Sequence, residues 1–166
     1  IIANRCLELM GLPKGDYDSF HPIDHVNRSQ STNDVYPTAI KLAMVFSLRS
    51  LLDEHRLLIE SFTAKGQEFA SILKVGRTQL QDAVPMTLGQ EFRAFATTLG
   101  EDLQHLKLLA PTLLTEVNLG GTAIGTGINA DPKYQALAVK RLAIISGHPL
   151  TPAVDLIEAT SDMGAF

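Results

Sequence analysis

Apolar residues recur every three or four positions along two long stretches of the chain. In the first stretch the repeating positions are Ile40, Met44, Leu48, Leu51, His55, Leu58 and Phe62. This spacing is the period of an α-helix, so it predicts a long amphipathic helix from Pro37 to the helix-ending Gly66. At about 1.5 Å per residue such a helix extends roughly 40 Å, more than the width of a small domain. Its apolar stripe is therefore expected to pack against other long helices.

The second stretch begins at Thr87-Leu88-Gly89-Gln90, which has the pattern of a capping box. In that motif the threonine hydroxyl and the glutamine side chain satisfy free N–H groups at the start of a helix. The apolar stripe that follows is Leu88, Phe92, Phe95, Leu99, Leu103, Leu106, Leu109 and Leu113. Pro111 removes one backbone donor, so we expect a kink or an early end near it.

A third, shorter helix is predicted from the N-cap Asp131 and Pro132 to Gly147. Strand-like alternation of apolar and polar residues is almost absent, so the predicted class is all-α, organised as a long-helix bundle. The chain starts inside an apolar helix-like stretch and stops without a polar tail. Gly11, Pro13, Gly15 and Pro22 break regular structure and predict a long loop that ends at Asn27. We expect residues 1–27 to be the end of an N-terminal domain and this loop. Residues 28–166 are then a central helical-bundle domain, truncated at its C-terminal side.

The composition of the chain argues against two classes of partner, nucleic acids and membranes. The formal net charge of −4 and a sequence pI near 5.7 give no basic surface for phosphate backbones, so no nucleic-acid partner is expected. No uncharged apolar run reaches the roughly 18 residues that cross a bilayer, so no membrane association is expected either. The single cysteine cannot form a disulfide within the chain. These features together favour a cytoplasmic protein.

Three polar, glycine-containing segments separate the apolar stretches: residues 21–37, 76–85 and 120–129. In the first, Ser29, Gln30, Ser31, Thr32 and Asn33 place several neutral hydrogen-bond donors at the entry of a helix. Free N–H groups and the positive end of the helix dipole favour an anion there, and a carboxylate ligand would suit the site. Ordinary N-capping explains one or two of these residues equally well.

The other two segments also allow two interpretations each. Arg77 could hold a carboxylate through a bidentate pair, or it could form a structural salt bridge. The glycines of residues 120–127 suggest a phosphate loop, but no Lys-Ser or Lys-Thr follows Gly125 and no buried strand precedes the segment. A tight turn with closely approaching backbones is the better interpretation.

His21, Asp24 and His25 could be metal ligands, but Pro22 keeps the two histidines off a regular helix and a third ligand is not near in sequence. We therefore predict no metal site and no cofactor. His55 lies on the apolar stripe of its helix and is interpreted as a hydrogen-bonded core residue rather than a catalytic one.

Four strings occur together, in order, along almost the whole chain: DHVNRSQSTND, GRTQLQDAVPMTLGQEF, GGTAIGTGIN and DLIEATSD. With these strings the sequence resembles the aspartase/fumarase superfamily. Within it, Ser31-Thr32-Asn33 and Gln79 look like the aspartase version of segments in which fumarases usually have Ser-Ser-Asn and His.

The resemblance implies a homotetramer with a large central helix bundle and active sites built from three subunits. It implies reversible deamination of L-aspartate to fumarate and ammonia, by removal of a C3 proton and stabilisation of an aci-carboxylate. By resemblance, Ser31 and Thr32 would hold the side-chain carboxylate, Asn33 the amino group and Thr78 the other carboxylate. Gln79 would support substrate orientation as the one catalytic candidate in the chain.

The sequence departs from the family pattern in three places. The Gly-Ser-Ser loop that carries the serine base does not occur in these 166 residues, and neither does the N-terminal segment with a substrate-binding threonine. Ile23 stands where hydratases have an asparagine of a second anion site, so that site is not predicted. The isolated chain is therefore expected to be inactive. A fumarate hydratase segment and a non-catalytic helical assembly unit remain the alternatives.

Overall fold

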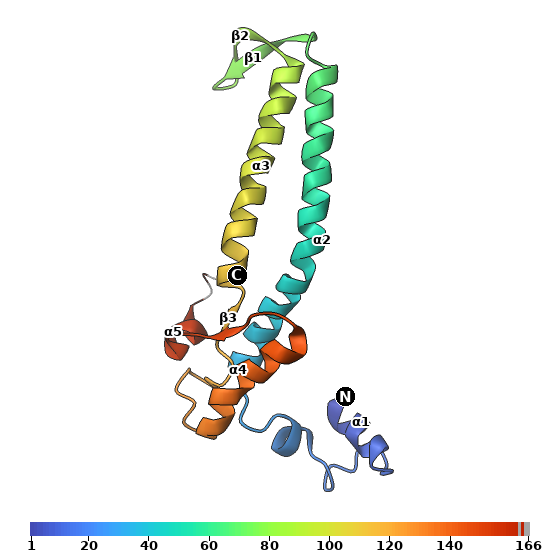
Figure 1. Ribbon diagram of the computed structural model, residues 1–166, viewed down its shortest axis with the longest axis vertical. Helices are drawn as coiled ribbons and strands as arrows, with labels where there is room; N and C mark the ends of the chain where they lie inside the picture. The colour runs from blue at the N-terminus through green and yellow to red at the C-terminus, as the bar shows by residue number, and fades with distance from the viewer. Residues whose placement is uncertain (163, 165–166) are drawn as a thin grey trace. The chain divides into compact units, whose positions relative to one another are not determined.

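The computed structural model describes residues 1–162 and 164. They form two compact units, each described by itself: Ile1–Leu42 together with Thr115–Phe166, and Ala43–Leu114. The predicted helical class is confirmed, since three of the helices account for most of the regular structure (Figure 1). The predicted division at residue 27 stays a prediction.

Helix α2 runs from Thr32 to Glu68 and therefore begins five residues before the predicted start at Pro37. The proline lies inside the helix, where its ring nitrogen cannot donate to the carbonyl of Asn33, four residues earlier. A side chain from another part of the chain supplies the missing donor: Asn118 Nδ2 lies 3.0 Å from the Asn33 oxygen. Sequence periodicity cannot detect such a distant donor, and for this reason the predicted helix was too short.

Within residues 43–114, α2 lies side by side with α3 (Leu88–Leu113) (Figure 1). Aromatic rings fill the space between them: the centroids of Phe62 and Phe92 are 5.6 Å apart. His55 Nε2 is 2.8 Å from the Leu99 carbonyl oxygen, which confirms the predicted hydrogen bond, and the side chain is half-buried rather than part of the core. The backbones approach closely at Gly89, where a Cβ would lie 2.7 Å from the Cα of Ala70.

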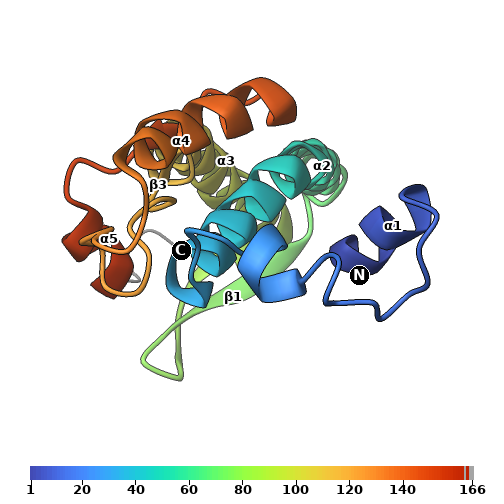
Figure 2. The ribbon, with the colours of Figure 1, turned by 90° about the horizontal axis from the view of Figure 1, so that it is seen from below.

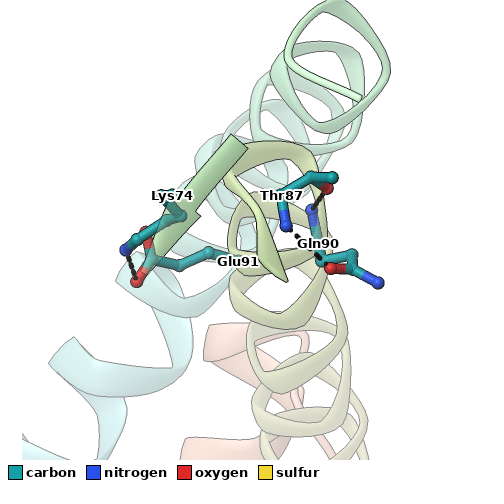
Figure 3. A network of polar contacts seen from close by, with 4 residues as sticks. All are labelled: Lys74, Thr87, Gln90 and Glu91. Carbon is teal, nitrogen blue, oxygen red and sulfur yellow. Dashed lines mark hydrogen bonds and ion pairs between the residues drawn. The ribbon is translucent and has the colours of Figure 1, made fainter. Parts of the chain in front are cut away.

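The predicted capping box at the start of α3 is present (Figure 3). Gln90 N donates to Thr87 Oγ1 at 3.1 Å, and Thr87 N donates to Gln90 Oε1 at 2.8 Å. Lys74, which lies in residues 73–78, contacts the first turn of α3, with its Nζ within 2.7 Å of both carboxylate oxygens of Glu91. The helix ends at Leu113, two residues after Pro111, so an end near this proline is present, but it comes at the last residue of the predicted stripe and not before it.

The segment between the two long helices is a β-hairpin, whereas the near-absence of strand-like alternation in the sequence predicted no strand. Strand β1 (Leu73–Thr78) pairs with β2 (Gln81–Thr87) in antiparallel fashion, with an irregularity between Val75 and Arg77. The turn is Gln79-Leu80, and both residues have positive φ, of 46° and 65°. A two-residue hairpin turn of this kind normally contains asparagine or glycine. Its usual sequence signal is therefore missing here.

The other unit contains α1 (Ile2–Leu9), the π-helix η1 (Pro22–Val26), α4 (Pro132–Ser146), α5 (Leu156–Ser161) and two short strands (Figure 2). The strands β3 (Glu116–Val117) and β4 (Thr151–Pro152) pair in parallel. Helix α4 matches its prediction, with Asp131 Oδ1 accepting from Lys133 N and Gly147 at φ 72° as the C-cap. A small core forms around Val117, Val139 and Leu150, with Leu42, Leu119, Leu142 and Ala143 packed against it.

Much of the two long apolar stripes is exposed in this chain. The exposed positions of the stripes are Met44, Leu51, Leu58, Phe95, Leu109 and Leu113. Among the described residues α2 is the one helix that is long and apolar enough, by length and composition alone, to cross a membrane. A helix buried in a large soluble assembly has the same composition.

Candidate active site

The N-terminal turn of α2 lies against the loop of residues 118–127, and a buried carboxylate joins them. Asp34 is 0% exposed. Its Oδ1 accepts from Ser31 N at 2.9 Å, and its Oδ2 accepts from Gly120 N at 3.1 Å and Thr122 N at 3.0 Å. Three backbone donors thus compensate for the removal of this charge from water. Asp34 is not among the site residues predicted from the sequence, although an acidic residue three positions after Ser31 is a capping signal.

Ser31 is the N-cap of α2, as the capping interpretation proposed. Its Oγ accepts from Asn33 N at 3.2 Å, and the Ser31 backbone N–H donates to Asp34 Oδ1. A hydroxyl that accepts one bond keeps its own hydrogen for a further partner. Thr32 and Asn33 lie in the first turn and are exposed, and neither hydroxyl nor amide is needed for the cap. The polar groups here therefore exceed what capping requires.

The orientation of the Asn33 amide is determined by its partner. Asn33 Nδ2 donates to the carbonyl oxygen of Ala123 at 2.7 Å. Because a carbonyl oxygen can only accept, the NH₂ group must face Ala123, and Oδ1 is left as the acceptor on the other side of the amide. The exposed end of Asn33 can therefore receive a hydrogen bond from a ligand.

The glycine loop is a tight turn, as predicted. A Cβ on Gly125 would lie 2.5 Å from both N and Cα of Ile157, so only glycine allows α5 to approach the loop this closely. Gly127 has φ 61° and faces the side chain of Gln135, whose Nε2 donates to the Gly120 oxygen at 2.9 Å. The loop is thus packed against two helices and holds a fixed shape.

Thr78 and Gln79 lie at the tip of the hairpin, and both are exposed. They belong to residues 43–114, whereas Ser31, Thr32 and Asn33 belong to the other unit. The five predicted site residues therefore form two groups, with Ser31, Thr32 and Asn33 in one unit and Thr78 and Gln79 in the other. Arg77 Nε forms an exposed ion pair with Asp82 Oδ1 across the hairpin at 3.2 Å, which is the structural alternative that the sequence allowed.

The Nδ1 atoms of His21 and His25, the two histidines considered as metal ligands, have local partners. His21 Nδ1 accepts from Ile23 N and Asp24 N, each at 3.2 Å, and so caps η1. His25 Nδ1 accepts from His21 N at 2.9 Å. These bonds explain why the residues occur together without invoking a metal.

The pKa values of two side chains, Tyr134 and Lys41, are shifted by their surroundings. Burial raises the pKa of Tyr134, the negative charge of Asp34 raises it further, and a hydrogen bond with Gln30 opposes the shift. Burial lowers the pKa of Lys41 although neighbouring carboxylates favour its cation, and Lys41 Nζ donates to the Glu116 carbonyl at 2.8 Å.

The sequence model of a lyase family, described simply as "Lyase", matches residues 1–166, the whole chain. This chain belongs to the lyase family. Curated relatives include the aspartate ammonia-lyases of Pseudomonas fluorescens, 71% identical, and Escherichia coli strain K12, 57% identical. Both alignments cover all of this chain but only 35% and 34% of those enzymes. The lyase chain therefore spans about a third of the length of these relatives.

Solved structures support the same assignment. A fumarate lyase:delta crystallin from Brucella melitensis matches 99% of the lyase chain, with a TM-score of 0.84 and 57% identity, over 35% of its own length. A class II fumarase from Schistosoma mansoni matches 95%, with a TM-score of 0.73 and 30% identity, over 36% of its length. The resemblance to the aspartase/fumarase superfamily is thereby confirmed.

Proposed function

We propose that the protein acts as an aspartate ammonia-lyase, which converts L-aspartate to fumarate and ammonia. The observation that carries the proposal is the fixed amide of Asn33. An ammonium group can only donate hydrogen bonds, and Asn33 presents an acceptor oxygen because its NH₂ group is held by Ala123. The high identity to curated aspartate ammonia-lyases supports the same activity.

The chemistry of the reaction explains the other polar groups. Removal of the C3 proton leaves an aci-carboxylate with two negative charges, which needs donors aimed in advance at its oxygens. The first turn of α2 offers the positive end of a long helix and the hydroxyl groups of Ser31 and Thr32. In our proposal Ser31 and Thr32 donate their hydroxyl hydrogens to the side-chain carboxylate from this turn.

Thr78 and Gln79 complete the site in the proposal. Thr78 would bind the second carboxylate, and Gln79 would support substrate orientation. They lie in a different unit of the chain from Asn33. We propose that association of several copies into a homotetramer places the two groups of residues around one substrate, which agrees with the exposed apolar stripes of α2 and α3.

Fumarate hydration is the second candidate, because a class II fumarase matches the fold. Water both donates and accepts hydrogen bonds, so an acceptor oxygen at Asn33 selects less strongly for it than for ammonium. The deciding experiment uses a full-length lyase that carries this sequence and measures fumarate formation from L-aspartate and from L-malate. We expect activity with L-aspartate only. Turnover of L-malate without turnover of L-aspartate would replace the proposal by the second candidate.

A further inference from the structure

The proline inside α2 creates a specific requirement at Asn33. Residue 37 has no N–H, so the Asn33 carbonyl cannot receive the usual helical hydrogen bond. Asn118 Nδ2 donates to that carbonyl at 3.0 Å and to Thr160 Oγ1 at 3.1 Å. One side-chain amide thus replaces a backbone donor that α2 lacks.

Asn118 is well placed to hold this position. It is 3% exposed, and its amide is oriented by the two acceptors on its nitrogen. Its Oδ1 lies 3.5 Å from Thr38 Oγ1, a second residue of α2. A buried amide whose donors and acceptor all face partners has little freedom to move.

The result is that Asn33 is held at both ends by one loop. Asn118 binds its main-chain oxygen, and the Ala123 carbonyl binds its side-chain nitrogen. These two contacts determine where Oδ1 of Asn33 points. If the contact with Asn118 were lost, the first turn of α2 could shift against the loop, and this oxygen would move with it. Asn118 can therefore affect the site although it is buried and does not reach the ligand itself.

We propose that Asn118 is a positioning residue for the amino-group subsite: by donating to the Asn33 carbonyl that Pro37 leaves unpaired, it sets the position of Asn33 Oδ1. The inference rests on the proposed function, in which Asn33 holds the amino group. A misplacement of about 1 Å in a site can reduce a rate by as much as 100-fold, so a buried residue can have a clear kinetic signature.

The test is a rescue experiment in a full-length lyase that carries this sequence. Asn118→Leu keeps the approximate size of the side chain and removes its donors, and we expect kcat/KM for L-aspartate to fall at least about 10-fold. Pro37→Ala restores a backbone N–H aimed at the Asn33 carbonyl and should by itself change kcat/KM by less than about 2-fold. In the double variant, the restored donor should recover most of the loss. A double variant no better than Asn118→Leu overturns the inference.

The reverse reaction separates positioning from general damage to the fold. In Asn118→Leu we expect the KM for ammonia to rise several-fold, with the KM for fumarate almost unchanged, because only the amino-group subsite is displaced. An equal rise of both constants would show a merely structural role and would also overturn the inference. Ser161→Ala is the matched control, since it removes an exposed hydroxyl of α5 that bonds only to the Glu158 carbonyl and not to Asn118, and both KM values should stay near those of the unmodified protein.

If Asn118→Leu does not fold, Asn118→Ser with and without Pro37→Ala is compared in the same way. Failure of the proposed function would give different experimental results from failure of this inference. In that case the unmodified protein does not deaminate L-aspartate, or Asn33→Ala leaves kcat/KM unchanged. Failure of the inference alone leaves both of those results normal and abolishes only the rescue.

Discussion

Asn33 is exposed at the first turn of α2, yet its amide is held in one orientation by Ala123. If the residue were only part of a helix start, Asn33→Ala would lower the free energy of unfolding by about 0.5 to 2 kcal/mol and leave turnover intact. We expect instead a drop of at least about 2 kcal/mol in transition-state stabilisation, roughly 30-fold in kcat/KM for L-aspartate. Both quantities are measured on the same variant of a full-length lyase that carries this sequence.

A suitable control is Asp131→Ala, which removes the N-cap of α4 and its bond to Lys133 N. It should lower the melting temperature by a comparable amount without changing kcat/KM. A destabilised Asn33→Ala protein with near-normal kcat/KM would remove Asn33 from the proposed site.

Asp34 is the buried residue on which the local geometry depends. Its two oxygens accept three backbone N–H groups, from Ser31, Gly120 and Thr122. Asp34→Asn keeps the shape but turns an NH₂ group toward at least one of these donors, which then loses its acceptor. A buried donor without a partner costs about 1 to 3 kcal/mol, and we expect the free energy of unfolding in urea to fall by that amount. Asp24→Asn, whose carboxylate is 76% exposed, should change it by less than about 0.5 kcal/mol. Equal stability of the two variants would contradict the role assigned to Asp34.

At the scale of an element, the start of α3 offers the clearest test. Both bonds of its capping box are present, between Thr87 and Gln90. Thr87→Ala should lower the free energy of unfolding by about 0.5 to 2 kcal/mol, measured by urea denaturation. Thr98 lies exposed within the same helix, where alanine has the higher helix propensity, so Thr98→Ala should be neutral or slightly stabilising. If both substitutions had the same effect, the box would contribute nothing.

The capped helices were predictable because their signals are local. Thr87, Asp131 and Gly147 each satisfy a neighbouring backbone group, and such contacts can be recognised from spacing alone. The hairpin was not predictable for an equally physical reason. Its turn residues Gln79 and Leu80 adopt positive φ without being glycine or asparagine, and Pro85 inside β2 argues against a strand.

The same distinction applies to the candidate site. Ser31, Thr32 and Asn33 could be found because they gather polar groups at a helix entry. The roles of Asp34 and Asn118 could not be predicted, because their partners lie far along the chain. Asp34 contacts Gly120 across 86 positions, and Asn118 contacts Asn33 across 85. No spacing rule connects residues that far apart, so their roles emerge only in three dimensions.

For the whole molecule, the exposed apolar stripes predict association between copies of the chain. Side chains such as Leu51 and Phe95 are 52% and 45% exposed, and burial of apolar surface is worth about 25 cal/mol per Å². We expect light scattering of the 166-residue polypeptide at micromolar concentration to report a dimer or a tetramer. Leu51→Lys should weaken this association, whereas Gln104→Lys, which adds a positive charge at an exposed polar position of α3, should not. A well-folded monomer at that concentration would count against the bundle.

The division of the chain into two units also bears on the order in which it folds. Residues 43–114 form one uninterrupted segment, while the other unit is assembled from two segments on either side of it. Contacts between residues near in sequence form faster, because the entropic cost of closing a loop grows with its length. The amides of residues 43–114 should therefore become protected first in pulse-labelled hydrogen exchange. The amide of Gly120 should become protected later, because its acceptor is the side chain of Asp34 in the distant segment. The turn that carries Asn33 would then be among the last parts of the protein to take its final form, because ribosomal synthesis must first reach Ala123, whose carbonyl oxygen holds the Asn33 amide.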